Sequence, residues 1–120
     1  MLPLLLALPL LIAADDKNVE LFTKKIQPVL KKHCYECHSA QAEEVKGDLR
    51  LDTSAGISKG GNNGPLIRPG DLENSFLLRV IRYQEDDYQM PPRGKLPDKV
   101  IEDFEAWVKG GGELPKDSKK

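Results

Sequence analysis

A five-residue stretch, Cys-Tyr-Glu-Cys-His at positions 34–38, constrains this chain more than any other feature. It contains both cysteines, Cys34 and Cys37, and His38 follows directly, while His33, the only other histidine, stands just before it. With 120 residues, the chain forms one domain with a small hydrophobic core, which a bound group or a crosslink would stabilise. The fold must therefore accommodate whatever these side chains bind.

Four interpretations of the motif compete. A disulfide between Cys34 and Cys37 would close a very short loop and stabilise little. A closed zinc site needs four ligands, and one local segment supplies at most three or four, with no second pair elsewhere. A dithiol redox site normally lies at a helix N-terminus, whereas this pair follows a predicted helix. We favour the fourth interpretation, covalent haem attachment.

Covalent haem explains every position of the motif, because C-x-x-C-H is the c-type attachment pattern. Cys34 and Cys37 would form two thioethers to the haem vinyl groups and act as anchors rather than nucleophiles. His38 would then be the proximal iron ligand. His33 is expected to be exposed or to lie near a propionate, and not to bind iron.

Met90 is the predicted distal iron ligand. It is the only methionine that remains if the N-terminal leader is removed. Its neighbours are polar, with EDDYQ before it and PPRGK after it, which is unusual for a methionine that merely fills a core. Iron ligation explains a methionine in this setting, and Pro91 and Pro92 would stiffen the loop behind it.

The first fourteen residues, MLPLLLALPLLIAA, predict an export signal. The apolar run is too short for a bilayer span, which needs ~20 residues, and Ala13 and Ala14 offer a small-residue cleavage site. The remaining chain is balanced, with 18 basic and 19 acidic residues and a net charge of −1. This balance argues against a nucleic-acid partner and against a polybasic membrane surface. We expect a periplasmic or otherwise exported protein without stable membrane insertion.

Apolar residues at helical spacing predict three helices, at 17–33, 71–83 and 97–109. Pro28 either kinks the first helix or starts a second helical piece, Asp71 is the expected N-cap of the second helix, and Gly110 ends the third. The glycine-rich stretch 39–70 is predicted to be mostly loop, and the segment at 56–70 to pass close to the haem edge. The domain is expected over 15–112, and a disordered tail over 113–120.

The chain resembles the class I c-type cytochromes and, more narrowly, the planctomycete-type cytochrome c domain. Four stretches carry the resemblance: IQPVLKKHCYECHSA, KGDLRLDT, GGNNGPLIRPGDLENSFLLRVI and MPPRGKLPDKVIEDFEAWVKGGG. It implies an all-α cytochrome c fold in which the N- and C-terminal helices pack together, with Phe22 and Trp107 in that contact or against the haem. It also suggests that the Pro65 carbonyl accepts the Nδ1–H of His38 and that Arg68 meets a propionate.

We therefore predict an exported monohaem cytochrome, an electron carrier rather than an enzyme, with six-coordinate iron between His38 and Met90. It would be a monomer that exchanges single electrons with redox partner proteins during transient docking. The alternative is a small-ligand sensor or a peroxidase-like protein, which applies if Met90 is labile. A non-haem binding domain with a disulfide or zinc remains a further possibility.

Overall fold

The computed structural model describes residues 14–117, so the predicted export signal lies outside the described residues except for Ala14. Within that range the chain forms helices and loops. Over these residues it forms two isolated β-bridges, Gly61 with Gly64 and Arg68 with Asp71, but no β-strand. The all-α prediction is therefore confirmed. The helical elements, in chain order, are α1 (Ala14–Leu21), η1 (Phe22–Ile26), α2 (Gln27–His33), η2 (Lys46–Asp48), α3 (Ser54–Lys59), α4 (Phe76–Ile81) and α5 (Asp98–Lys109).

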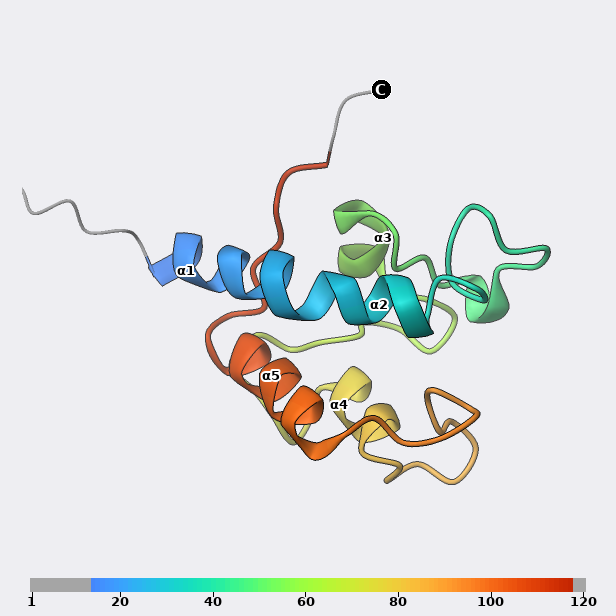
Figure 1. The fold of residues 1–120 in the computed structure, drawn as a ribbon. Coiled ribbons are helices and arrows are strands. Elements are labelled where there is room, and N and C mark those ends of the chain that lie inside the picture. The colour runs from blue at the N-terminus through green and yellow to red at the C-terminus, as the bar shows by residue number, and fades with distance from the viewer. Residues whose placement is uncertain (1–13, 118–120) are drawn as a thin grey trace, which may run out of the picture.

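The first three elements follow one another as a single helical rod (Figure 1). Its middle section, η1, is π-helical, and the Gln27 N–H bonds to the carbonyl of Phe22, five residues back. Pro28 stands in the first turn of α2, where its missing N–H does least harm. The wider π turn thus precedes the proline, and Pro28 starts a second helical piece without ending the rod.

The rod and α5 pack together through two buried aromatic rings. The rings of Phe22 and Trp107 lie 5.2 Å apart between centroids, tilted by 40°. Both side chains are almost fully buried, at 2% and 1% exposure. Beside them, the Asn18 amide donates to the Trp107 carbonyl over 3.0 Å. The predicted contact between N- and C-terminal helices is confirmed, and these two rings belong to it.

Gly110 ends α5 as expected and permits close approach of the two helices. A Cβ at this position would lie 2.3 Å from the amide nitrogen of Asn18. Such a distance is well inside van der Waals contact, so a larger residue would displace the Asn18 amide from the Trp107 carbonyl to which it donates.

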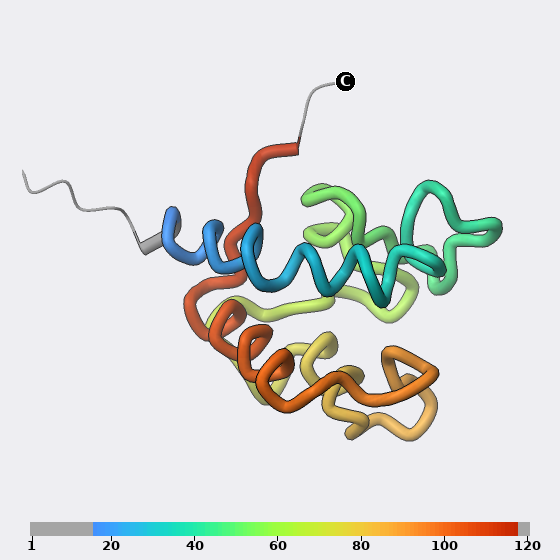
Figure 2. Tube along the Cα trace, viewed as in Figure 1, coloured from blue at the N-terminus to red at the C-terminus, as the bar shows by residue number. Residues whose placement is uncertain are grey.

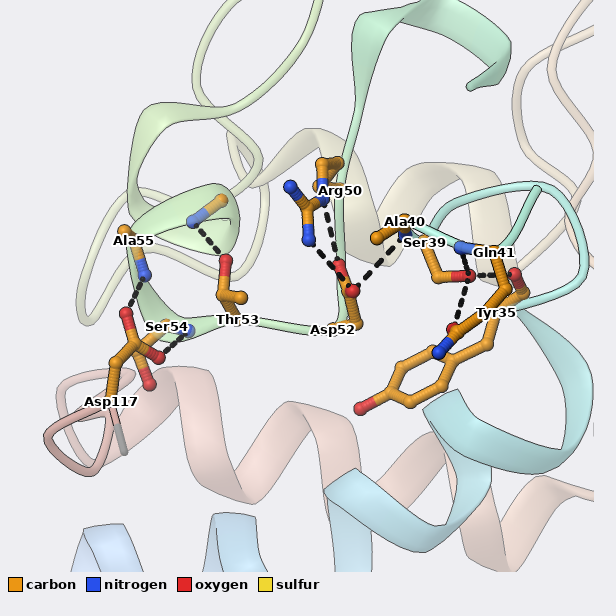
Figure 3. Close-up of polar contacts among 11 residues, drawn as sticks. Tyr35, Ser39, Ala40, Gln41, Arg50, Asp52, Thr53, Ser54, Ala55 and Asp117 are labelled. Carbon is orange, nitrogen blue, oxygen red and sulfur yellow. Dashed lines mark hydrogen bonds and ion pairs between the residues drawn. The ribbon is translucent and has the colours of Figure 1, made fainter. Parts of the chain in front are cut away.

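Two residues of the segment 113–117, at its two ends, are hydrogen-bonded to the rest of the domain, and Figure 3 shows the contacts of Asp117, while Figure 2 traces the path of the segment. Trp107 Nε1 donates to the Glu113 carbonyl over 2.9 Å, and the Glu113 N–H donates to Asn18 Oδ1 over 2.6 Å. Further on, the Asp117 carboxylate accepts from the N–H groups of Ser54 and Ala55, at 2.6 and 3.0 Å. Glu113 and Asp117 thus make specific contacts with the domain, and the domain boundary at residue 112 stays a prediction.

The middle helix, α4, is much shorter than the 71–83 that we predicted. Asp71 does not cap it, because its carboxylate accepts from the backbone and side-chain N–H groups of Asn74 at 3.0 and 2.9 Å. Ser75 Oγ donates to the Asp71 carbonyl over 2.6 Å and accepts from the Arg68 N–H over 2.9 Å. These local bonds compete with helix formation, so α4 begins only at Phe76.

The stretch 39–70 contains a short helix, α3, that the sequence analysis missed. Thr53 caps it, since its Oγ1 accepts from the Gly56 N–H over 2.9 Å (Figure 3). The loop before it is fixed by the Asp52 carboxylate, which accepts from the Arg50 guanidinium at 2.9 and 3.1 Å and from the Ala40 N–H at 3.1 Å. This stretch is thus ordered by polar side chains.

Candidate cofactor site

One apolar cavity of about 440 Å³ lies between α2, α4, α5 and the loops that connect them. Its volume falls within the range of about 300–1,000 Å³ that cofactor and ligand pockets occupy. The apolar residues of its wall come from several segments between residues 30 and 104: Leu30, Leu49, Leu51, Leu66, Phe76, Leu77, Val80, Ile81, Leu96 and Phe104. Cys34, Cys37, His38 and Met90 line the same cavity.

The two thiols lie in the turn that follows α2. The Cys34 N–H bonds to the Leu30 carbonyl over 2.8 Å, and the His38 N–H returns to the Cys34 carbonyl over 3.0 Å, so the motif is wound back on itself. The thiols are not joined as a disulfide. Burial raises the pKa of Cys34 to about 11, and the neighbouring Cys37 adds to the rise. A dithiol redox site requires the opposite shift of the pKa.

A zinc site has no donor set in the part of the chain that the structure describes. Within residues 14–117, no three His, Cys, Asp or Glu side chains are placed to hold one metal ion. His33, which stood as a possible further ligand, is exposed at the rim of the cavity. This exposed position is the one that we expected for His33.

His38 is held by three hydrogen bonds, one of which corrects a prediction. Besides its N–H bond to Cys34, its carbonyl accepts from the Leu51 N–H over 2.8 Å, and its ring Nδ1 lies 3.2 Å from the Leu49 carbonyl. We predicted the Pro65 carbonyl as this partner, but Pro65 is exposed and Leu49 takes the role. The two stretches meet because the Leu49–Leu51 segment runs directly beside the motif.

The bond to Leu49 fixes the chemistry of the His38 ring. A carbonyl only accepts, so Nδ1 carries the proton and Nε2 keeps its lone pair for a metal. Burial lowers the pKa of His38, although bonding to the Leu49 and Lys46 carbonyls partly opposes this. A lowered pKa favours the neutral imidazole, which is the form that binds iron.

Met90 reaches the cavity from the loop that follows α4. Its N–H donates to the Val80 carbonyl near the end of α4, over 3.1 Å, and its half-buried side chain packs against the core. The structure thus brings together the motif and a residue far along the chain, on one cavity. Ligation by Met90 remains a prediction, and this placement is what it requires.

The structure supports the expected position of the glycine-rich stretch beside the cavity, but it does not support a role for Arg68. Gly61 and Gly64, from the glycine-rich stretch, line the cavity. A Cβ on Gly61 would lie 2.6 Å from the Gly47 carbonyl, so glycine lets two loops close over the site. Arg68, by contrast, is exposed and paired through its backbone with Asp71, and it lies outside the cavity wall. The suggested contact with a propionate therefore has no support.

Several residues of the site were not predicted from the sequence. The Leu49 carbonyl carries no side-chain signal, and so no motif could have revealed it. Tyr88 packs edge-on against Phe76 at the cavity, with ring centroids 5.7 Å apart. The Tyr83 hydroxyl donates to the Pro91 carbonyl, beside Met90. Tyr88 stood in a stretch that composition marks only as polar loop, and Tyr83 stood at the end of the predicted helix 71–83.

Comparison with known families agrees with this geometry. The model of the family described as "Planctomycete cytochrome C" matches residues 34–94, just over half of the chain. The chain belongs to this family. The match begins at Cys34 and includes Cys37, His38 and Met90, which indicates a haem-binding, electron-carrier role for the domain. The chain matched no curated protein and no solved structure.

Proposed function

We propose that this family member is an exported monohaem c-type cytochrome that carries single electrons between redox proteins. One observation carries the proposal: two thiols, an oriented imidazole and a thioether, from two distant segments, line one apolar cavity. This set matches the ligands of a covalently attached, six-coordinate haem. Other sites that use cysteine pairs have no need of the methionine or of the apolar wall.

The residues of the cavity suit a haem in detail. The free thiols of Cys34 and Cys37 would hold the haem through two thioether bonds, each formed by adding a thiol across a vinyl group, and burial raises the pKa of Cys34 to about 11. Nε2 of His38 is the ring nitrogen left for the iron, because Nδ1 is engaged by Leu49. The apolar walls would cover the faces of the macrocycle and exclude water.

When bound, the haem iron supplies a one-electron redox couple. The protein contributes by fixing His38 and Met90 on the cavity wall, so that ligation differs little between the two oxidation states. A thioether ligand and apolar surroundings both favour the reduced state and raise the reduction potential. If His38 and Met90 both bind the iron, no position would remain for a substrate, and electron exchange is then the function that the site supports.

The rim of the cavity suits short-lived docking with a redox partner. It carries charges of both signs, including Lys46 and Asp87, together with the exposed Tyr88. A chain with a net charge of −1 exerts little long-range steering, so we expect moderate association rates that change little with salt. We propose a monomer whose partners are redox proteins and not nucleic acids.

The apolar leader supports export of the protein. The first fourteen residues have the length and composition of a signal h-region. Within residues 14–117, no helix is both long enough and apolar enough to cross a membrane. We therefore propose that the mature domain works outside the cytoplasm, in the periplasm or its equivalent.

The test is to produce the chain together with c-haem maturation enzymes and to measure the haem that stays with the denatured polypeptide. The proposal predicts one haem per chain that survives acid–acetone extraction, and a reversible redox titration that fits one electron. A Cys34→Ala, Cys37→Ala variant serves as the matched control and should release its pigment. An unpigmented wild-type protein would contradict the proposal. Covalent haem that turns over peroxide or binds carbon monoxide readily would favour the sensor or peroxidase alternative.

A further inference from the structure

We propose that Tyr83 is a positioning residue for Met90. Its hydroxyl ties the Met90–Pro91 turn to the end of α4, and so helps the Met90 thioether to remain on the iron against competing ligands. The inference rests on the proposed function, because it concerns the distal side of the same cavity. The contact that carries it is the hydrogen bond from the Tyr83 hydroxyl to the Pro91 carbonyl, one residue beyond Met90.

A single backbone carbonyl anchors both ends of the loop that presents Met90. The Val80 carbonyl accepts from the Tyr83 N–H over 3.3 Å and from the Met90 N–H over 3.1 Å. Residues 83–90 therefore form a loop whose two ends meet at the Val80 carbonyl of α4. The backbone bond places the Met90 N–H at the end of α4, but it does not tie the following turn, with the Pro91 carbonyl, to that helix.

Tyr83 adopts a backbone conformation that a tyrosine rarely takes. Its φ is +61°, in the left-handed region that glycine or asparagine usually occupies. Such strain persists where the surrounding structure requires the residue, and it often marks a functional position. The left-handed backbone turns the chain sharply at the end of α4, and the long side chain carries the hydroxyl to the far side of the loop. A glycine would relieve the strain and lose this second tie.

The other contacts of the loop do not reach Met90. The Gln84 N–H bonds to the Arg79 carbonyl over 2.9 Å, and the Arg79 guanidinium pairs with Glu85 over 2.8 Å. These contacts fix the first part of the loop, whereas residues 86–89 are all exposed. On the far side, the Pro91 carbonyl also accepts a long 3.4 Å bond from the Gly94 N–H. The Tyr83 hydroxyl is thus the side-chain donor that ties the Met90 turn to α4.

The expected consequence is a barrier to ligand exchange. External ligands such as imidazole bind oxidised iron only when the Met90 thioether leaves it. Without the Tyr83 hydroxyl, the turn should move away more easily, and imidazole should compete better. Losing one hydrogen bond of ordinary strength corresponds to about a three- to tenfold change in such an equilibrium.

The experiment compares Tyr83→Phe with wild type in the haem-loaded protein. The substitution keeps the ring and removes only the hydroxyl. The measurement is the dissociation constant of imidazole for the oxidised protein at neutral pH, followed through the visible spectrum. We expect a decrease of about three- to tenfold in Tyr83→Phe. Gln89→Ala is the matched control, because Gln89 is exposed on the same loop and is not part of the cavity wall, and it should behave as wild type.

A second variant separates positioning from general stability. Arg82 forms a 2.9 Å ion pair with Glu105, which joins α4 to α5 without touching the Met90 turn. Arg82→Gln should lower the unfolding midpoint and leave imidazole affinity unchanged. If Tyr83→Phe shifts the unfolding midpoint alone, or shifts imidazole affinity no more than Arg82→Gln does, the positioning role is refuted. A wild-type protein that shows no methionine ligation would instead refute the proposed function, so the two failures are distinguishable.

Discussion

The two sides of the molecule are built in different ways. Where the rod meets α5, Phe22, Trp107 and their neighbours fill the interior and contact one another directly. Around the motif and the Met90 loop, equally apolar side chains are arranged about a cavity of roughly 440 Å³. The helix contact completes its core with the chain's own residues, whereas the cavity side gains its apolar contacts from a cofactor under our proposal. The two sides should therefore respond differently to the loss of haem and to mutation.

The largest expected effect is the loss of both anchors in a Cys34→Ser, Cys37→Ser variant. Covalent haem should disappear completely, and the loops around the cavity should lose their main packing partner. Hydrogen exchange followed by mass spectrometry should show fast exchange over residues 45–66 and 83–96, with residual protection in the rod and α5. Equal loss of protection in both regions would contradict the division into two sides.

Trp107→Ala tests the helix contact directly. Trp107 is almost fully buried, so its truncation should cost about 3–5 kcal/mol of unfolding free energy in the haem-loaded protein, measured by chemical denaturation. Tyr88→Ala is the counterpart on the cavity side. Tyr88 is 41% exposed, and its loss should cost about 1 kcal/mol or less. Similar losses of unfolding free energy for both variants would mean that the helix contact contributes no more to stability than the cavity side does.

Asn18→Ala tests how much the polar bonds of the helix contact contribute to stability. Asn18 is 94% buried and bonds the Trp107 carbonyl and the Glu113 N–H, so its removal leaves two backbone groups without these partners. We expect a loss of about 1–3 kcal/mol by denaturation, together with faster exchange at residue 113. Gln89→Ala, on the exposed part of the Met90 loop, should change stability by less than about 0.5 kcal/mol. If the two substitutions had equal effects, the bonds of Asn18 would contribute little.

The same contrast shows what sequence reasoning can predict here. The helices of the rod and α5 were predictable, because apolar residues such as Phe22, Ile26 and Trp107 recur at the spacing of a helix that buries one face. The contact between them was implied by the family resemblance and not by this spacing. The motif and Met90 were recognisable because their residue types are rare in this chain. Prediction failed where backbone groups or single polar side chains decide the structure. Leu49 binds His38 through a carbonyl, and Asp71 and Ser75 bond locally and delay α4.

The smallest expected effect concerns the polar loop beside α3 and its dependence on pH. Bonding to the Arg50 guanidinium, supported by the Ala40 N–H, lowers the pKa of Asp52 below its usual value. A lowered pKa means that the carboxylate stabilises the fold fully above about pH 4 and loses this contribution as pH falls through the folded-state pKa. Asp52→Asn should therefore reduce the drop in urea midpoint between pH 5 and pH 3. An unchanged drop would show that the acid sensitivity arises elsewhere.

The most direct test of the central claim is the absorption spectrum of the oxidised, haem-loaded protein, recorded for wild type and for Met90→Ala. Ligation by Met90 predicts a weak far-red band from sulfur-to-iron charge transfer in the wild type, its loss in Met90→Ala, and retained covalent haem in both. Carbon monoxide should bind the reduced variant rapidly and the reduced wild type slowly. A wild-type protein that lacks the far-red band and binds carbon monoxide as readily as Met90→Ala would contradict ligation by Met90, and with it the assignment as an electron carrier with six-coordinate iron.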